Sequence, residues 1–499
     1  MAVDTTPRRF SRRRLLRGSG LALAGLAGAS LLAACTPPSQ MESKPAAAPA
    51  KPAEAAKPAE AAKPAAPAAQ PAATTAPAKP AEAAKPAATT AAAAPAKPAG
   101  TAPVTLKAMY WSAGPEDHQI HQNVMDKFTK LNPDIKMDFD DVPSAEFPET
   151  LLTRIVGGTP PDVVKLHAAW VLNFILAKQL NDLTDRMKTD KSVFIPTQLG
   201  FWEHDAKNYG VPYYSGSSIV FYNKTIFDKA GVKTPEEHEK EGTWTWATLQ
   251  ESAKAVSGGS GAERIFGYDA AQQPVNLQFY TCVPIWCNGG EITNKEETEY
   301  LLTDPAVVEV IQQQADMILK DKSVPQTSDL QGATWLFRTG RVGMSWTGRF
   351  RSNELTAVNF EPRMVSAPKG KTNQAVNRDG PNGTGLPVGT KNLDQAYKFA
   401  MYFGGPDAAS EYLVTGATNP VRNDLLDSAE FKQSIKPFER IEVLTGSAKT
   451  VRAWRVPGRG AEAARALTAE FEKVIVGQQD VPTAMKNAKA AMDPLLKVR

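Results

Sequence analysis

Cysteine and histidine are scarce in this chain of 499 residues, which contains three cysteines and five histidines. Cys282 and Cys287 lie close together and leave two alternatives open, a local disulfide or two buried thiols. A metal site is disfavoured because no histidine is near them in sequence and two thiolates supply only half of a tetrahedral shell. His118 and His121 have no third ligand in sight. We therefore expect neither a metal nor another cofactor.

The chain also lacks an apolar run of the ~20 residues that a membrane-spanning helix needs. The run from Leu21 to Leu32 is shorter and rich in alanine and glycine; it follows the arginines of SRRRLLR (11–17) and precedes LAAC (32–35). This order is typical of a twin-arginine signal peptide that ends in a lipobox. We predict that residues 1–34 are a signal peptide and that Cys35 is acylated. The protein would then be extracytoplasmic, held by a lipid on the outer face of the cytoplasmic membrane.

The chain after residue 34 carries no net positive charge. Residues 1–34 contain six arginines and one aspartate, so the formal charge of +4 falls to −1 without them. Residues 36–102 add seven lysines and four glutamates, which leaves −4 on the chain from Pro103 onward. Because nucleic acid binding needs a basic patch, we expect no nucleic acid partner.

Residues 35–103 have too few large apolar side chains to form a core. The sequence KPAEAA occurs at residues 51, 57 and 79, and proline recurs every few residues. Frequent proline interrupts helices and favours an extended, polyproline-like chain. We therefore predict a disordered tether between the acylated cysteine and a folded body.

From residue 104 onward, strand and helix patterns alternate. Apolar residues alternate in 104–110 and 135–139 and run together at 163–164, whereas 120–131, 147–156 and 171–176 show helical spacing. The order β-α-β-α-β-α predicts an α/β fold with helices on both faces of a sheet. About 400 residues are too many for one small core, so two lobes are expected.

Several motifs in this region resemble those of the extracellular solute-binding proteins of sugar-type ABC importers, the maltose-binding-protein-like family. They are LNPDIKM (131–137), GGTPPDVV (157–164), LNDLTD (180–185), YGVPYY (209–214), FYNKTIFDKAG (221–231), TWATL (245–249), FRTGRVGM (337–344) and NPVR (419–422). The resemblance implies a two-lobed type II periplasmic-binding-protein fold, with a mixed sheet in each lobe and a ligand cleft between the lobes. It places lobe 1 at 104–214 plus about 369–420, and lobe 2 at 215–368 plus about 421–499.

The resemblance also implies a function and its partners. We expect a monomer that captures a sugar without altering it and delivers it to an ABC permease with its ATPase. By analogy, the chain should cross between lobes near 214–218 and again near 366–370. The sequence Ser215-Gly216-Ser217-Ser218 suits a hinge because small side chains permit changes in φ and ψ.

A sugar site needs flat rings for the C–H faces and fixed polar groups for the hydroxyls. Residues that follow strands or flank the expected hinge are therefore the candidates: Trp111, Ser112, His167, Trp170, Tyr213, Tyr214, Trp286, Trp346 and Arg349. For each ring the alternative is core packing, and for Arg349 it is a surface ion pair.

Two other functions remain open. An exported, lipid-anchored carbohydrate-active enzyme would need two opposed carboxylates, for which Glu146, Glu149 and Asp162 could be nominated. No Gly-x-Ser-x-Gly nucleophile motif is present, and we predict no catalytic residue. A receptor for a non-sugar solute is the second alternative.

Overall fold

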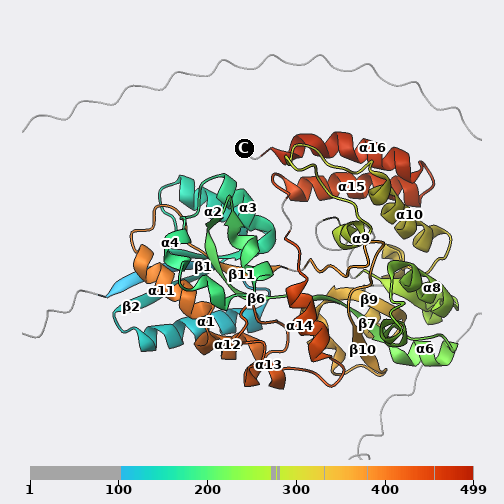
Figure 1. The fold of residues 1–499 in the computed structure, drawn as a ribbon, viewed down its shortest axis with the longest axis horizontal. Helices are drawn as coiled ribbons and strands as arrows, with labels where there is room; N and C mark the ends of the chain where they lie inside the picture. The colour runs from blue at the N-terminus through green and yellow to red at the C-terminus, as the bar shows by residue number, and fades with distance from the viewer. Residues whose placement is uncertain are drawn as a thin grey trace, which may run out of the picture. The chain divides into compact units, whose positions relative to one another are not determined.

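A computed structural model describes residues 103–270, 277, 281–330, 332–378, 380–453 and 456–497. The predicted signal peptide, the acylation of Cys35 and the tether lie outside the described residues, apart from Pro103. No helix in the described ranges is both long and apolar enough to cross a bilayer. The described chain is built around two separate sheets, shown in Figure 1.

The first sheet has five strands in the order β2-β1-β3-β11-β6. Their bounds are Ile135–Asp141, Val104–Tyr110, Val163–His167, Pro381–Gly385 and Gly210–Ser215. β1 is parallel to both neighbours, whereas β11 is antiparallel to β3 and β6. The helices of this lobe are α1 (Pro115–Leu131), α2 (Phe147–Val156), α3 (Ala168–Leu176), α4 (Thr184–Met187), α5 (Pro196–Leu199), α11 (Leu393–Phe403) and α12 (Pro406–Leu413). The predicted β-α-β-α-β-α order is confirmed over residues 104–176.

Local sequence explains why α1 begins and ends where it does. Pro115 stands in the first turn, where its missing N–H costs nothing, and two acidic residues follow it. The buried positions His121, Val124, Met125 and Phe128 recur at helical spacing and face the sheet. Asn132 ends the helix by donating from Nδ2 to the carbonyl of Phe128.

The second sheet has four strands in the order β10-β7-β9-β8. Their bounds are Pro362–Val365, Ser218–Asn223, Val342–Gly348 and Phe266–Asp269. The helices of this lobe are α6 (Lys224–Ala230), α7 (Pro235–Lys240), α8 (Trp246–Val256), α9 (Cys282–Cys287), α10 (Pro305–Leu319), α15 (Gly460–Ile475) and α16 (Val481–Met492). α15 and α16 pack on each other and on α10.

The remaining elements are short or lie near the junction of the two sheets. They are β4 (Glu203–His204), β5 (Lys207–Asn208), α13 (Ala429–Gln433), α14 (Ile441–Lys449) and the 3₁₀ turns η1 (Lys191–Val193), η2 (Gly200–Trp202), η3 (Gly261–Glu263), η5 (Thr327–Leu330), η6 (Leu336–Thr339), η7 (Arg349–Leu355) and η8 (Asp493–Leu496). α14 contacts both α5 of the first lobe and β7 of the second.

Three chain segments connect the lobes: one between β6 and β7, one between β10 and β11, and one between α14 and α15. Asn377 joins all three. Its side chain accepts from the backbone N–H of Ser218 at 3.1 Å and donates to the carbonyl of Ser218 at 2.7 Å. Its backbone pairs with Thr450 and Arg452. We propose that these crossings divide the lobes, which gives α13 and α14 to the junction and α15–α16 to the second lobe.

Cys282 and Cys287 are buried thiols that are not joined by a disulfide, so the disulfide alternative is not the one adopted. The two residues lie at opposite ends of α9. Residues five apart on a helix point about 140° away from each other, which separates their sulfur atoms. Burial raises the pKa of the Cys282 thiol to about 12.

Gly383 on β11 and Gly210 on β6 lie against the indole of Trp202, which the first lobe buries. A Cβ on Gly383 would lie 2.2 Å from Trp202 Cζ2, closer than any real contact. We predict that Gly383→Ala lowers the free energy of unfolding by about 1–3 kcal/mol, because the ring or strand must shift. Urea denaturation measures this change.

Gly446→Ala is the matched control, since Gly446 lies in α14 and a Cβ there meets nothing within 4 Å. This variant should be more stable by about 0.5–1 kcal/mol because alanine is the better helix former. Unchanged stability in Gly383→Ala would contradict the close packing around Trp202.

Candidate functional site

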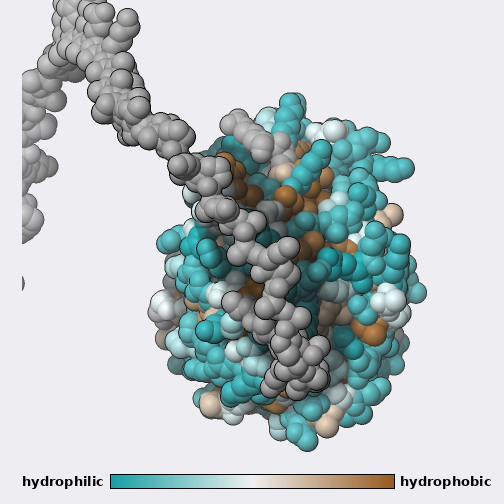
Figure 2. Space-filling view, turned by 90° about the vertical axis from the view of Figure 1, so that its left-hand side faces the viewer, coloured by the Kyte–Doolittle hydropathy of each residue, from teal (hydrophilic) through white to brown (hydrophobic). Residues whose placement is uncertain are grey.

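A cavity of about 660 Å³ lies between the lobes, and both lobes and two of the crossings line it. The first lobe contributes Trp111, Ala113, Gly114, Pro115, Glu116, Asp117, Ile120, His167, Tyr214, Ser215, Asn382, Tyr412, Thr415, Ala417 and Thr418. The second lobe contributes Ser218, Gly348, Phe350, Asn353 and Glu354, and the crossings contribute Gly216, Arg378 and Gly380. The outer face of the first lobe, seen in Figure 2, is mostly hydrophilic.

Aromatic rings reach the cavity from both lobes. Trp111 follows β1, Tyr214 lies on β6, and Tyr412 packs behind Tyr214 with 5.6 Å between ring centroids. Phe350, in η7 of the second lobe, is 50% exposed. A large apolar ring that is half exposed beside a cavity is available to a ligand.

Three buried polar atoms of the lining have no hydrogen-bond partner among the described residues: Trp111 Nε1, Asn382 Oδ1 and the Tyr412 hydroxyl. Asn382 is only 8% exposed and Tyr412 1%. Buried polar groups are ordinarily satisfied, and leaving one unpaired costs about 1–3 kcal/mol. These atoms have almost no accessible surface, so a solute in the cavity reaches them only if the wall rearranges.

His167 ends β3 and begins α3. Its Nδ1 accepts from the backbone N–H of Ala169 at 3.1 Å, so the ring proton lies on Nε2. Burial lowers the pKa of His167 to about 3, with the charges of Arg378 and Lys165 acting in the same direction. The ring is therefore neutral near pH 7. Asn382 lies opposite His167 in the neighbouring strand, so both reach the same part of the cavity.

Of the nine residues predicted from the sequence, Trp111, His167 and Tyr214 line the cavity. Trp170 does not line it but packs edge-on against Trp111, with 5.7 Å between centroids. Ser112 Oγ lies 3.3 Å from His121 Nδ1, behind the cavity wall. Tyr213 is fully buried against Phe403, at 4.2 Å between centroids.

Trp346 and Trp286 lie in the core of the second lobe and are not among the residues that line this cavity. Trp346 is completely buried on β9 and packs against Trp246 at 5.3 Å between centroids. Trp286 is buried on α9, and the guanidinium of Arg452 covers its ring. Because β9 runs on to Gly348, the cavity begins two residues after Trp346.

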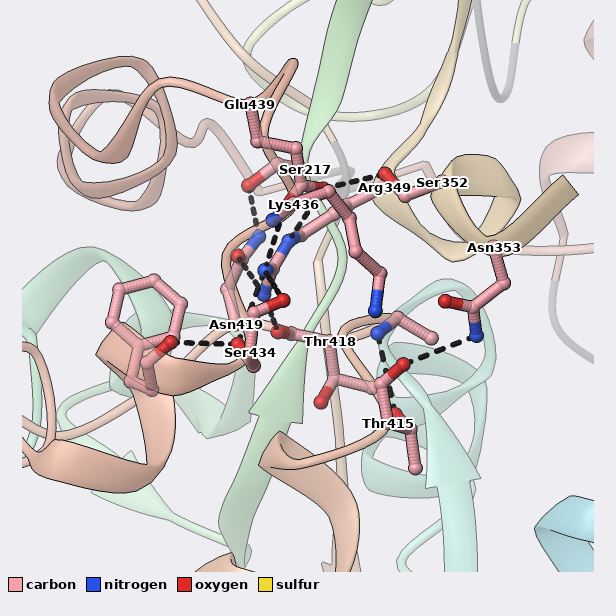
Figure 3. Close-up of polar contacts among 12 residues, drawn as sticks. Ser217, Arg349, Ser352, Asn353, Thr415, Thr418, Asn419, Ser434, Lys436 and Glu439 are labelled. Atoms are coloured by element: carbon pink, nitrogen blue, oxygen red, sulfur yellow. Dashed lines mark hydrogen bonds and ion pairs between the residues drawn. The ribbon is translucent and has the colours of Figure 1, made fainter. Parts of the chain in front are cut away.

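Arg349 does not line the cavity and forms half of a buried ion pair (Figure 3). Its Nε and Nη2 donate to the two carboxylate oxygens of Glu439 at 3.1 and 2.9 Å. The rest of its guanidinium donates to the carbonyl of Thr418 and to Ser434. Its donors are therefore occupied by the protein.

Sequence reasoning missed Phe350, Arg378, Asn382 and Tyr412. Phe350 carried one usable signal, since it follows the Gly-Arg pair immediately after a buried strand. Asn382 and Tyr412 carried none, because their neighbours come from strands and helices distant in the sequence.

Two lobes joined by three adjacent crossings, with a cavity between them, define a solute-binding protein of the periplasmic type. The chain belongs to the bacterial extracellular solute-binding protein family, whose model matches residues 111–410.

Individual relatives agree with this assignment. The chain is 25% identical to a binding protein of Brucella abortus over 425 residues, which cover 80% of this chain and 94% of that one. It is 27% identical over 143 residues to the arabinooligosaccharide-binding protein of Bacillus subtilis, covering 27% and 33% of the two chains.

Solved structures share the fold. An ABC substrate-binding protein of Listeria monocytogenes in complex with cycloalternan matches with a TM-score of 0.67 and 24% identity, covering 79% of this chain and 98% of that one. The cyclic alpha-maltosyl-1,6-maltose binding protein of Arthrobacter globiformis matches with a TM-score of 0.66 and 20% identity, covering 79% and 99%. The two-lobed fold expected from the sequence is confirmed.

Glu439→Gln should lower the free energy of unfolding by about 3–5 kcal/mol, because it leaves the Arg349 guanidinium buried without its counter-charge. Urea denaturation followed by circular dichroism measures the loss. Glu241→Gln is the control, since Glu241 forms an exposed pair with Lys233 and should change stability by less than about 1 kcal/mol. Equal effects of the two substitutions would contradict the structural role of Arg349.

His167 should make stability depend on acid pH. Its folded-state pKa of about 3 lies below the ordinary value of 6.5, so the unfolded chain binds the proton more readily. The free energy of unfolding is therefore unaffected by this group above pH 6.5 and falls as the pH drops from 6.5 towards 3, by at most about 1.4 kcal/mol per pH unit.

His167→Asn keeps an acceptor for the Ala169 N–H and removes this contribution. We expect a smaller difference between unfolding free energies at pH 7.5 and pH 5 than in the wild type. His121 and His238, whose pKa values burial also lowers, contribute to the slope that remains. If the unfolding free energy of His167→Asn depends on pH as steeply as that of the wild type, His167 is not the group responsible.

Proposed function

We propose that this chain is the extracytoplasmic receptor of an ABC importer and that it captures a mono- or oligosaccharide in the cavity. The observation that carries the proposal is the lining, which combines aromatic rings from both lobes with polar side chains such as Asp117, Asn353 and Asn382. A sugar offers C–H faces for the rings and hydroxyls, each both donor and acceptor, for the polar atoms.

The relatives support a sugar as the ligand class. One curated relative is an arabinooligosaccharide-binding protein, and two structures of the same fold are described with cycloalternan and as a binder of cyclic maltosyl-maltose. Another relative is an sn-glycerol-3-phosphate-binding protein of Pectobacterium atrosepticum, which keeps a non-sugar solute as the second candidate.

Delivery to a permease requires that the loaded protein differ from the empty one. A ligand stabilises a closed form only if it binds that form better than the open form. A sugar held between Trp111 and Phe350 would contact both lobes at once and favour closure. We propose that the closed receptor, acting as a monomer, is what the permease and its ATPase recognise.

The carboxylates that line the cavity, Glu116, Asp117 and Glu354, are not the ones that the sequence nominated for hydrolysis. Glu146, Glu149 and Asp162, the nominated catalytic acids, are not among the residues that line the cavity. Asp162 instead accepts from the backbone N–H of Lys107 at 2.8 Å and from the side chain of Asn392. It therefore has a structural role at the start of β3.

The N-terminal sequence supplies the cellular setting of the proposal. A twin-arginine signal peptide over residues 1–34 would export the protein, and an acylated Cys35 would hold it at the membrane. The proline-rich tether would let the folded body reach its permease.

A thermal-shift panel tests the function. Purified protein is heated with maltose, maltotriose, arabinotriose, cycloalternan and sn-glycerol 3-phosphate. We expect Tm to rise with the concentration of at least one sugar, as ligand binding to the folded state requires. Phe350→Ala should lower the affinity for that sugar by about 10–30-fold, because it removes a ring whose burial contributes about 1.5–2 kcal/mol to binding.

Leu131→Ala is the control for loss of an exposed apolar side chain, since Leu131 is 63% exposed at the end of α1. It should leave the sugar response unchanged. Stabilisation by sn-glycerol 3-phosphate alone would favour the non-sugar receptor, and cleavage of an oligosaccharide, read by chromatography, would overturn the binding role.

A further inference from the structure

Lys165 is a fully buried lysine directly behind the aromatic wall of the cavity. It lies on β3, where the flanking residues Val164 and Leu166 are apolar and also fully buried. Burying an ammonium in such a place is costly unless the charge is paired and all its N–H groups are satisfied. The partners of the Lys165 ammonium therefore indicate its role.

The ammonium has three N–H groups and three partners. Nζ lies 2.9 Å from Asp117 Oδ2 and 3.2 Å from His121 Nε2. It also lies 3.8 Å from the centroid of the Trp111 ring, a close cation–π contact. The Tyr214 ring is the next aromatic, at 5.8 Å.

His121 completes the network in one protonation state. Burial lowers the pKa of His121 well below 6.5, and the charge of Lys165 adds to the effect. The neutral ring accepts from Lys165 through Nε2, which leaves the proton on Nδ1, 3.3 Å from Ser112 Oγ. Ser112 adjoins Trp111, so the network also holds the backbone that carries the indole.

Asp117 ties the same loop to α1. Its Oδ2 accepts from the backbone N–H of Ala113 at 3.0 Å as well as from Lys165. The segment 111–113 is therefore attached at its ring, at Ser112 and at Ala113 to one charged cluster. Trp170 contacts the indole from a second direction.

We infer that Lys165 is a positioning residue for ligand binding, whose ammonium fixes the Trp111 indole in the orientation that meets the solute. This inference rests on the proposed function. The face of the indole that Lys165 covers is closed to a ligand, so stacking uses the remaining surface of the ring. A ring fixed before binding loses less side-chain entropy when the solute arrives.

The test uses the full chain with 5-fluorotryptophan incorporated. Each of its nine tryptophans then gives a ¹⁹F signal. Trp111→Phe identifies the Trp111 signal. In Lys165→Met we expect this signal to shift and broaden, and affinity for maltotriose or arabinotriose, measured by titration calorimetry, to fall about 10-fold. Lys165→Arg should keep both close to wild type, because a guanidinium also stacks on aromatic rings.

Lys127→Met is the matched control. Lys127 lies on α1, pairs with Glu411 and does not line the cavity, so both readouts should match the wild type. If Lys165→Met does not fold, the double variant Lys165→Met/Asp117→Asn removes both charges together, and the Trp111 signal alone is read. Loss of a charge 3.8 Å from the ring shifts the signal by itself, so a purely structural lysine would lower stability without broadening the signal or weakening sugar binding.

The outcomes separate the two proposals. An unchanged Trp111 signal, or an affinity within twofold of wild type in Lys165→Met, would overturn the positioning role and leave the sugar receptor standing. Alternatively, the Trp111 signal could respond to Lys165→Met while no sugar of the panel stabilises the protein. That result would overturn the sugar receptor but would still show that Lys165 orients the Trp111 ring.

Discussion

The ion pair between Arg349 and Glu439 is the contact on which the junction of the two lobes depends. It joins the end of β9 to the segment between α13 and α14, 90 residues later in the chain. A buried pair stabilises only when its remaining hydrogen-bonding capacity is used, and here Ser352 and the backbone of Lys436 complete the carboxylate. Because the backbone N–H of Arg349 also donates to Ser217, the pair fixes the first crossing as well.

The junction and the ligand site share residues. Ser218 lines the cavity and is held by Asn377, while Thr418 lines the cavity and accepts from Arg349. A solute in the cavity therefore touches the same segments that must rotate when the lobes move. Any contact that differs between the open and closed arrangements changes their relative free energy, which is what a transport receptor requires.

The local part of this structure could be predicted, and the nonlocal part could not. Alternation and helical spacing predicted β1 to α3 because those signals lie within a few residues of each element. Trp346 looked like a cleft residue because periodicity does not reveal where a strand ends or which of its faces is covered. Arg349 could not be assigned because Glu439 is distant in sequence. Phe350 was overlooked beside these more conspicuous residues.

The two walls of the cavity differ in how firmly their rings are held. Lys165 and Trp170 hold Trp111, and Tyr213 and Tyr412 pack on Tyr214, so the first lobe presents a fixed surface. Phe350 is half exposed on the second lobe. A ligand seated on the fixed wall gains little from further ordering there. Phe350 is the exposed apolar ring beside the cavity, and we propose that closure of the second lobe on a ligand would bury it.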